Sequence, residues 1–219
     1  MRRPEAFTRL RQLHRPVFES AEASAALRLS PTATATMLAR LADDALVVKL
    51  RHGLWALPEA WGGRVDPLDV LPVITRPYPS YASMWTALSA HGMIEQVPRG
   101  VYGVSVDRAR HVETSIGTFH LHAVTPALYG GMADATGARA GLATPEKSMF
   151  DTVYLLVAEK GRASLPEIDL PAGFDEDALF SWVDRITSRR LATLVDRNLH
   201  DLLRFASRPD DVQDEPAHL

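Results

Sequence analysis

The sequence predicts an α+β protein in which an N-terminal winged helix-turn-helix is followed by a mixed α/β C-terminal domain with a small sheet and several helices. Three observations lead to this expectation. Residues 16–57 contain two short helical patterns, a tight turn and a two-stranded hairpin pattern in close succession. Strand-like and helix-like patterns are mixed along the rest of the chain. The 219 residues, 46% of them hydrophobic, are enough for two modest domains.

Turn residues mark the expected linker between the two domains, and acidic residues mark the expected tail. We expect the winged helix-turn-helix domain over residues 1–60 and the C-terminal domain over residues 69–206. Glycine, proline and polar residues cluster in the expected linker, residues 61–68. Residues 207–219 are polar and acidic, and we expect them to be disordered.

The first 31 residues contain two short helices. Phe7, Leu10 and Leu13 recur every three residues in Pro4–Leu13, which is typical of an amphipathic helix ending before a proline. A second helix over 19–28 is weakly apolar and rich in alanine. Ser30 is a good N-cap and Pro31 suits the first position of a third helix.

The third helix and the hairpin form the surface that we expect to contact DNA. Leu38, Leu41 and Ala45 should face the core, while Met37 lies on the opposite, exposed side. A hairpin over 46–57 turns at a glycine, and Trp55 should pack beneath it.

Threonine and basic side chains suit contact with bases and phosphates. We therefore expect DNA contacts from Thr32, Thr34, Thr36, Arg40, Lys49, Arg51 and His52. The alternative is a small helical domain that docks on protein with a solvated basic face.

Charge supports the DNA interpretation and composition excludes other classes. Residues 1–64 carry a net charge of +4 and residues 65–219 carry −7, so only the N-terminal part favours a polyanion. The absence of cysteine excludes disulfides and thiol chemistry and fits a reducing cytoplasm. The sequence contains no run of about 18 apolar residues, so we expect no membrane span. We expect a cytoplasmic protein with no membrane contact.

The body shows both strand and helix patterns. We expect strands over 70–75, 101–106 and 111–124, the last with a hairpin turn near Gly117. Helices are expected over 81–90, 176–186 and 190–205. A further helix begins at Thr144-Pro145-Glu146, where the threonine caps, the proline takes the first position and the glutamate favours the positive end of the helix dipole.

Three sequence blocks of the body resemble the AbiEi family of antitoxins. They are Tyr81-Ala-Ser-Met-Trp-Thr-Ala-Leu-Ser-Ala-His-Gly-Met93, Gly117-Thr-Phe-His-Leu-His122 and Ala143-Thr-Pro-Glu-Lys-Ser-Met-Phe-Asp151. The resemblance covers roughly residues 5–160, and the last block is its most specific part. It implies a two-domain antitoxin that represses its own operon by binding inverted repeats in the promoter. It also implies a cognate nucleotidyltransferase toxin, countered directly or indirectly through the C-terminal domain.

An enzymatic role is the alternative that the resemblance leaves open. A related antitoxin has been proposed to phosphorylate its toxin, yet no phosphate-binding loop or protein-kinase block is present here. Lys147 and Asp151 are interpreted as an exposed i,i+4 pair worth about 0.3 kcal/mol rather than as catalytic groups. His111, His120 and His122 lie on neighbouring strand patterns, but no carboxylate completes a metal site. We therefore expect no catalytic residues, no metal and no cofactor.

Overall fold

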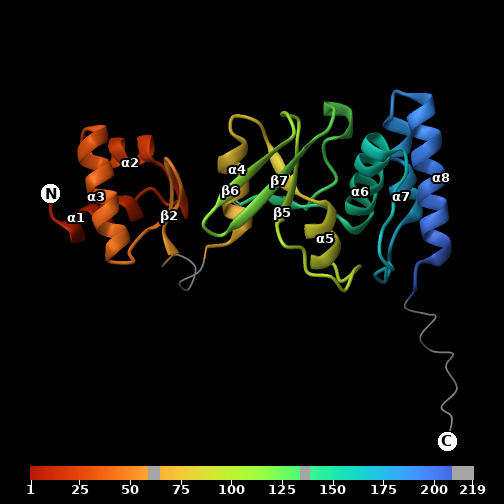
Figure 1. The fold of residues 1–219 in the computed structure, drawn as a ribbon, viewed down its shortest axis with the longest axis horizontal. Helices are drawn as coiled ribbons and strands as arrows, with labels where there is room; N and C mark the ends of the chain where they lie inside the picture. Colours follow the sequence, from red (N-terminus) through yellow and green to blue (C-terminus); the bar gives the residue numbers. More distant parts are fainter. Residues whose placement is uncertain (59–64, 134–138, 209–219) are drawn as a thin grey trace, which may run out of the picture.

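The computed structural model describes residues 1–58, 65–133 and 139–208. The chain is drawn out along one axis, with the N-terminal unit (residues 1–58) at one end (Figure 1). The body (residues 65–208) follows, with its sheet in the middle and its last helices at the far end. The protein is of the α+β class, as expected, with two separate sheets.

The N-terminal unit combines three helices with a three-stranded antiparallel sheet. Its elements in order are α1 (Arg3–Arg11), β1 (Val17–Glu19), α2 (Ser20–Leu27), α3 (Pro31–Asp43), β2 (Val48–Arg51) and β3 (Leu54–Ala56). The strand order is β1-β3-β2. The expected cap of α3 is confirmed, since the Ser30 side chain accepts a hydrogen bond from the Ala33 amide. Strand β1 was not predicted, because three residues are too few to show an alternating pattern.

The body is built on a mixed five-stranded sheet. Its strands are β4 (Ser80–Ala82), β5 (Val101–Ser105), β6 (Arg110–Thr114), β7 (Gly117–Ala123) and β8 (Gly141–Leu142), in the order β6-β7-β5-β4-β8. Its helices are α4 (Pro67–Thr75), α5 (Met84–Ala90), α6 (Pro145–Lys160), α7 (Glu176–Phe180) and α8 (Arg189–Phe205), with short 3-10 turns η2 (Pro126–Leu128) and η3 (Val183–Arg185).

Two body elements differ from the sequence expectation. The predicted strand over 70–75 is helix α4, which begins at Pro67 with the Asp66 side chain capping the Leu68 amide. Most of this helix is buried, so its run of apolar residues lacks the alternation that separates helix from strand. The predicted helix over 81–90 is divided into β4 and α5, because Tyr81 pairs with Val104 of the sheet.

The ends of the expected segments also shift. Residues 59–64 lie outside the described residues, and with them the first half of the expected linker, residues 61–68; α4 begins near the end of that linker, at Pro67. The predicted helix over 176–186 is divided into α7 and η3. At the C-terminus Ser207 still bridges to Asp169, whereas the rest of the expected tail from residue 209 lies outside the described residues.

A shared hydrophobic cluster joins the N-terminal unit to the body. It unites the strands of the N-terminal sheet with α4 and with one face of the large sheet. The buried members are Val17, Leu50, Leu54, Ala56, Val70, Leu71, Val73, Ile74, Ala82, Phe119, Leu121 and Ala140. The Ser115 amide, in the β6–β7 turn, also donates a hydrogen bond of 2.8 Å to the Leu50 carbonyl of β2. The body therefore supports the β2–β3 hairpin through packing in this cluster and through one backbone hydrogen bond.

No helix in residues 1–58, 65–133 or 139–208 combines the length and apolar character needed to cross a bilayer.

We predict that Leu71→Ala lowers the free energy of unfolding by about 2–5 kcal/mol, because it opens a cavity in the shared cluster. Urea unfolding followed by both tryptophan fluorescence and circular dichroism measures the change. Val97→Ala is the control, since Val97 is 83% exposed and should change stability by less than about 0.5 kcal/mol. A loss for Leu71→Ala as small as that of the control would contradict the shared core.

Candidate nucleic-acid interface

Helix α3 presents a face of small and polar side chains to solvent. Thr32, Ala33, Thr36 and Arg40 are exposed, as expected for three of the predicted DNA contacts. The Thr36 hydroxyl donates a hydrogen bond of 3.1 Å to the Thr32 carbonyl, which leaves its oxygen free to accept from a ligand. With no bulky side chain in its first turn, this end of α3 allows close approach of a partner.

The structure places three residues of this region differently from the prediction. Thr34, predicted to contact DNA, is only 1% exposed, and its hydroxyl oxygen lies 3.1 Å from that of Ser24 on α2. Met37 is buried at 7% exposure rather than exposed. Ala45, expected in the core, is exposed beyond the helix end with a positive φ of 57°. The buried stripe of α3 is therefore Thr34, Met37, Leu38 and Leu41, a 3–4 spacing that starts one turn earlier than predicted.

The β2–β3 hairpin carries the other predicted contacts at its exposed tip. Lys49, Arg51 and His52 are all exposed, and Gly53 makes the turn with a φ of 78°. Trp55 lies beneath the hairpin as predicted, and its indole N–H donates to the Ser20 hydroxyl at 3.0 Å. The hairpin tip is thus basic, exposed and supported by packed residues.

Two acidic residues, Asp43 and Asp44, lie at the C-terminal end of α3, opposite its exposed first turn. Asp43 is its last residue, and Asp44 pairs with Arg3 at 2.8 Å. A polyanion at the first turn of α3 would therefore lie at the other end of the helix from both aspartates. Arg28, exposed between α2 and α3 and not predicted, adds a further positive charge beside the start of α3.

The pair Lys147–Asp151 on α6 is completely buried, which corrects the prediction of a surface pair. Both side chains have 0% exposure, and the Lys147 Nζ lies 2.5 Å from the Asp151 Oδ1. An i,i+4 spacing places the two on one helix face, but spacing alone does not say which face. Here that face also carries Phe150 and is covered by the loop before β8 and by Trp182.

Every polar atom of this buried pair has a partner. Lys147 also donates to the Leu128 carbonyl at 2.8 Å. The other carboxylate oxygen of Asp151 accepts hydrogen bonds from the Tyr81 hydroxyl at 3.0 Å and from the Ser83 hydroxyl at 2.7 Å. The network connects β4, η2 and α6, which are distant along the chain.

Aromatic rings close the site around the lysine. The Lys147 Nζ lies 4.3 Å from the Trp182 ring centroid and 4.9 Å from that of Phe150. Gly131 packs so closely that a Cβ there would be 2.6 Å from Trp182 and 2.9 Å from the Lys147 Cγ. Its φ of 70° also favours glycine.

Burial shifts the ionisation of the cluster. Burial raises the pKa of Asp151, opposed by the attraction of Lys147 and by the three hydrogen bonds that its carboxylate accepts. Burial likewise lowers the pKa of Lys147, opposed by Asp151. The pKa of Tyr81 is raised by burial and then by the Asp151 charge. Because the pair is inaccessible and its polar atoms are bonded within the protein, it cannot contact a substrate in this conformation.

Sequence reasoning missed Tyr81 and Ser83, because they fell within a predicted helix. The sequence nevertheless indicated burial of the pair. Lys147 and Asp151 lie on the same helix face as Phe150 and Tyr154, which form an aromatic stripe. Charged residues in an apolar stripe indicate a buried pair rather than a surface one.

The three strand histidines lie on one face of the large sheet, and two of them, His111 and His120, are in contact. His111 and His120 are paired across β6 and β7 with their Nδ1 atoms 3.0 Å apart. His120 also stacks on Tyr102, 4.7 Å between ring centroids. Burial, and then its neighbour His111, lowers the pKa of His120. Within the described ranges no three His, Asp or Glu side chains are grouped so that they could hold a metal ion.

Comparison of the chain with models of known protein families and with curated proteins finds no match in either.

We predict that Lys147→Met lowers the free energy of unfolding by about 3–5 kcal/mol, because it leaves the Asp151 carboxylate buried without its cation. Arg197→Ala is the matched control, since Arg197 also has an aspartate partner at i+4 but is 79% exposed. That change should cost less than about 0.5 kcal/mol. Equal, small losses for both variants in urea unfolding would show that the buried pair contributes no more than a surface pair.

Proposed function

We propose that the protein is a cytoplasmic antitoxin that represses its own operon by binding promoter DNA through α3 and the β2–β3 hairpin. The observation that carries the proposal is the topology of the N-terminal unit. The order helix, strand, helix, helix, strand, strand, with β1 paired to β3, is the order expected of a winged helix-turn-helix and supports the proposal. In this arrangement the third helix enters the major groove and the hairpin, or wing, contacts the backbone or the minor groove.

The exposed side chains support this role for the unit. Thr32 and Thr36 lie in the first half of α3, where short hydroxyl side chains bond to phosphates or base edges. Arg40 follows on the same helix, and Lys49, Arg51 and His52 supply charge at the wing. Thr34 is not part of the proposed interface, because it is buried against α2.

The proposed partner of the body is a nucleotidyltransferase toxin encoded beside the antitoxin. The support is the resemblance of its sequence blocks to AbiEi antitoxins, above all Ala143–Asp151. The buried state of Lys147 and Asp151 assigns that block to the core of the body and so weakens the alternative of an atypical kinase that would use these two groups.

We predict that Arg40→Ala weakens binding to the region upstream of the gene by about 1–3 kcal/mol if it reads a base, since a bidentate contact is worth that much. Lys49→Ala/Arg51→Ala should instead reduce the slope of log affinity against log salt by about two, through the loss of two phosphate contacts. Fluorescence anisotropy with the full-length protein at several salt concentrations measures both. Arg197→Ala on the distant α8 should leave affinity and slope unchanged.

Two results would contradict the proposal. One is an affinity for upstream DNA that does not fall with added salt, and the other is a loss of affinity in Arg197→Ala as large as in Arg40→Ala.

The proposed action on a toxin is tested separately by expressing the neighbouring reading frame with and without this gene. A nucleotidyltransferase whose toxicity is relieved would support it, and an unrelated harmless neighbour would overturn it. Co-purification then separates direct from indirect action.

A further inference from the structure

A cleft of ≈ 600 Å³ lies where the N-terminal unit meets the body. One side is formed by the segment 13–17 between α1 and β1, and the other by α4 together with residues near Ser80, Tyr129 and Gly141. Ligand sites commonly occupy such junctions and have volumes of about 300–1,000 Å³. The cleft lies apart from the exposed face of α3, so it is independent of the proposed DNA contacts.

A buried carboxylate with one oxygen that lacks a hydrogen-bond donor lines this cleft. Asp69 of α4 is 2% exposed, and its Oδ2 has no partner among the described residues. Burial, and then the nearby charge of Asp66, raises the pKa of Asp69, while Arg139 opposes the shift. Arg139, however, is paired with Asp66 at 2.8 Å. A buried carboxylate oxygen left unpaired is costly, so a ligand that supplies N–H donors would be favoured here.

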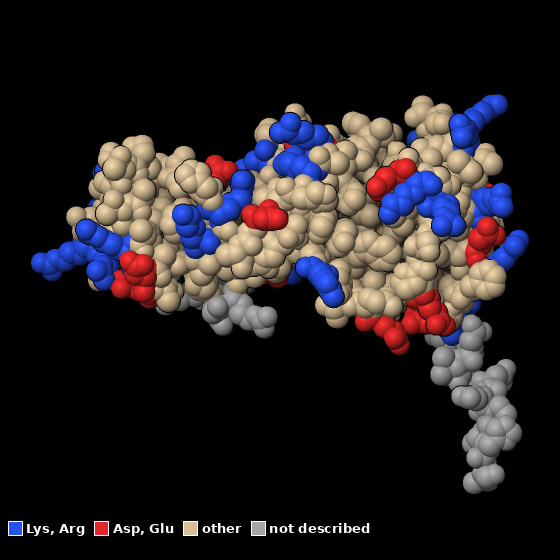
Figure 2. Space-filling model, viewed as in Figure 1, with Lys and Arg blue, Asp and Glu red and all other residues tan. Residues whose placement is uncertain are grey.

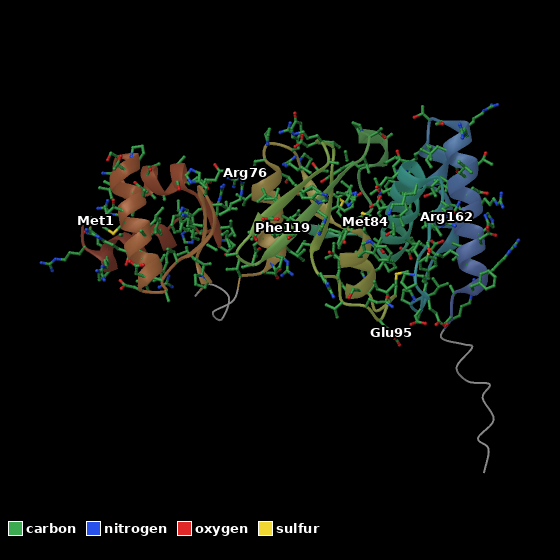
Figure 3. All side chains as sticks on the ribbon, viewed as in Figure 1. Met1, Arg76, Met84, Glu95, Phe119 and Arg162 are labelled. Carbon is green, nitrogen blue, oxygen red and sulfur yellow. The ribbon has the colours of Figure 1, made fainter. Side chains whose placement is uncertain are left out.

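The same cleft is lined by three arginines, Arg15, Arg76 and Arg139. Arg15 and Arg76 both pair with one carboxylate, that of Glu22, at 2.8 Å and 3.2 Å. Two guanidinium groups that share one carboxylate retain a positive charge for an anion. Figure 2 shows basic side chains gathered where the N-terminal unit meets the body, and Figure 3 labels Arg76 at this place.

We propose that this cleft binds a guanine nucleotide, with Asp69 accepting hydrogen bonds from the base and Arg15 and Arg76 holding the phosphates. Guanine is the base that places two N–H donors side by side on its Watson–Crick edge, which matches a carboxylate. Guanidinium groups match phosphate oxygens in the same way. Tyr129 and the apolar wall of Pro72, Val73 and Met132 supply surface for the base.

The ligand must donate hydrogen bonds to Asp69, carry negative charge for the arginines and fill the volume of the cleft. A polyamine would satisfy Asp69 but would be repelled by the arginines. A free amino acid carries both charges but fills only a small part of ≈ 600 Å³. Adenine places an acceptor beside its single amino donor and so would oppose an ionised Asp69.

The test uses the full-length protein with GTP, ITP, ATP and inorganic tripolyphosphate, in calorimetric titration and thermal unfolding. GTP at about 100 times its Kd should raise Tm by about 5–10 °C. ITP lacks the 2-amino group and should bind at least about tenfold more weakly. ATP and tripolyphosphate should bind more weakly still.

Two variants separate the base contact from the phosphate contact. Asp69→Asn should weaken GTP binding by about tenfold or more and abolish the preference over ITP, without lowering the Tm of the free protein, since it removes an unpaired buried charge. Arg76→Ala should weaken all three nucleotides and tripolyphosphate together. Asp196→Asn and Arg197→Ala, both exposed on α8, are the matched controls.

Two outcomes would overturn the proposal. One is the absence of any GTP-dependent shift in wild-type Tm. The other is equal binding of GTP, ATP and tripolyphosphate that Asp69→Asn leaves unchanged, which would describe an anion site without base recognition. Either result would leave the proposed DNA binding untouched, because none of these variants lies on α3 or the hairpin.

Discussion

The body of this protein depends on one buried ion pair. Lys147 and Asp151 are removed from water, and the cost of burying them is offset only because their other bonding capacity is met by the Leu128 carbonyl and the Tyr81 and Ser83 hydroxyls. These partners belong to the central sheet and the loop after it, so the pair positions α6 against both. Trp182 covers the ammonium group from the C-terminal helices, and Gly131 allows the loop to approach. A single arrangement of strand, loop and helices satisfies all these contacts together.

A second constraint acts on the N-terminal unit. Its sheet packs on α4 and on the large sheet through the shared cluster, and the Ser115–Leu50 hydrogen bond ties the hairpin to the β6–β7 turn. In the proposed repressor, the wing is therefore presented from a support that belongs to the body. A fragment ending at residue 58 would lose eight of the twelve buried residues of the cluster.

Local chemistry could be predicted from the sequence where it acts within a few residues. The caps Ser30 and Thr144 were predicted correctly, as were the β6–β7 hairpin and the position of Trp55. Long-range burial could not be predicted in the same way. Helix α4 was taken for a strand because burial on several sides removes its period, and Lys147–Asp151 was taken for a surface pair because its cover comes from Tyr81, Leu128 and Trp182, far away in sequence. Thr34 shows the same limit at the candidate site, since it lies only two positions from the exposed Thr32 and Thr36 but on the opposite side of the helix.

The two proposals divide the molecule between an exposed basic surface and a recessed cleft. The first is central, because it explains why α3 leaves short side chains uncovered while the hairpin beside it carries charge. Hydroxyl-radical footprinting of the full-length protein on its own upstream region tests it most directly. Operator binding through α3 and the wing should protect paired segments about one helical turn, or a multiple of it, apart, each with an inverted copy of one short sequence. Uniform reactivity along the DNA at protein concentrations that saturate binding would contradict it.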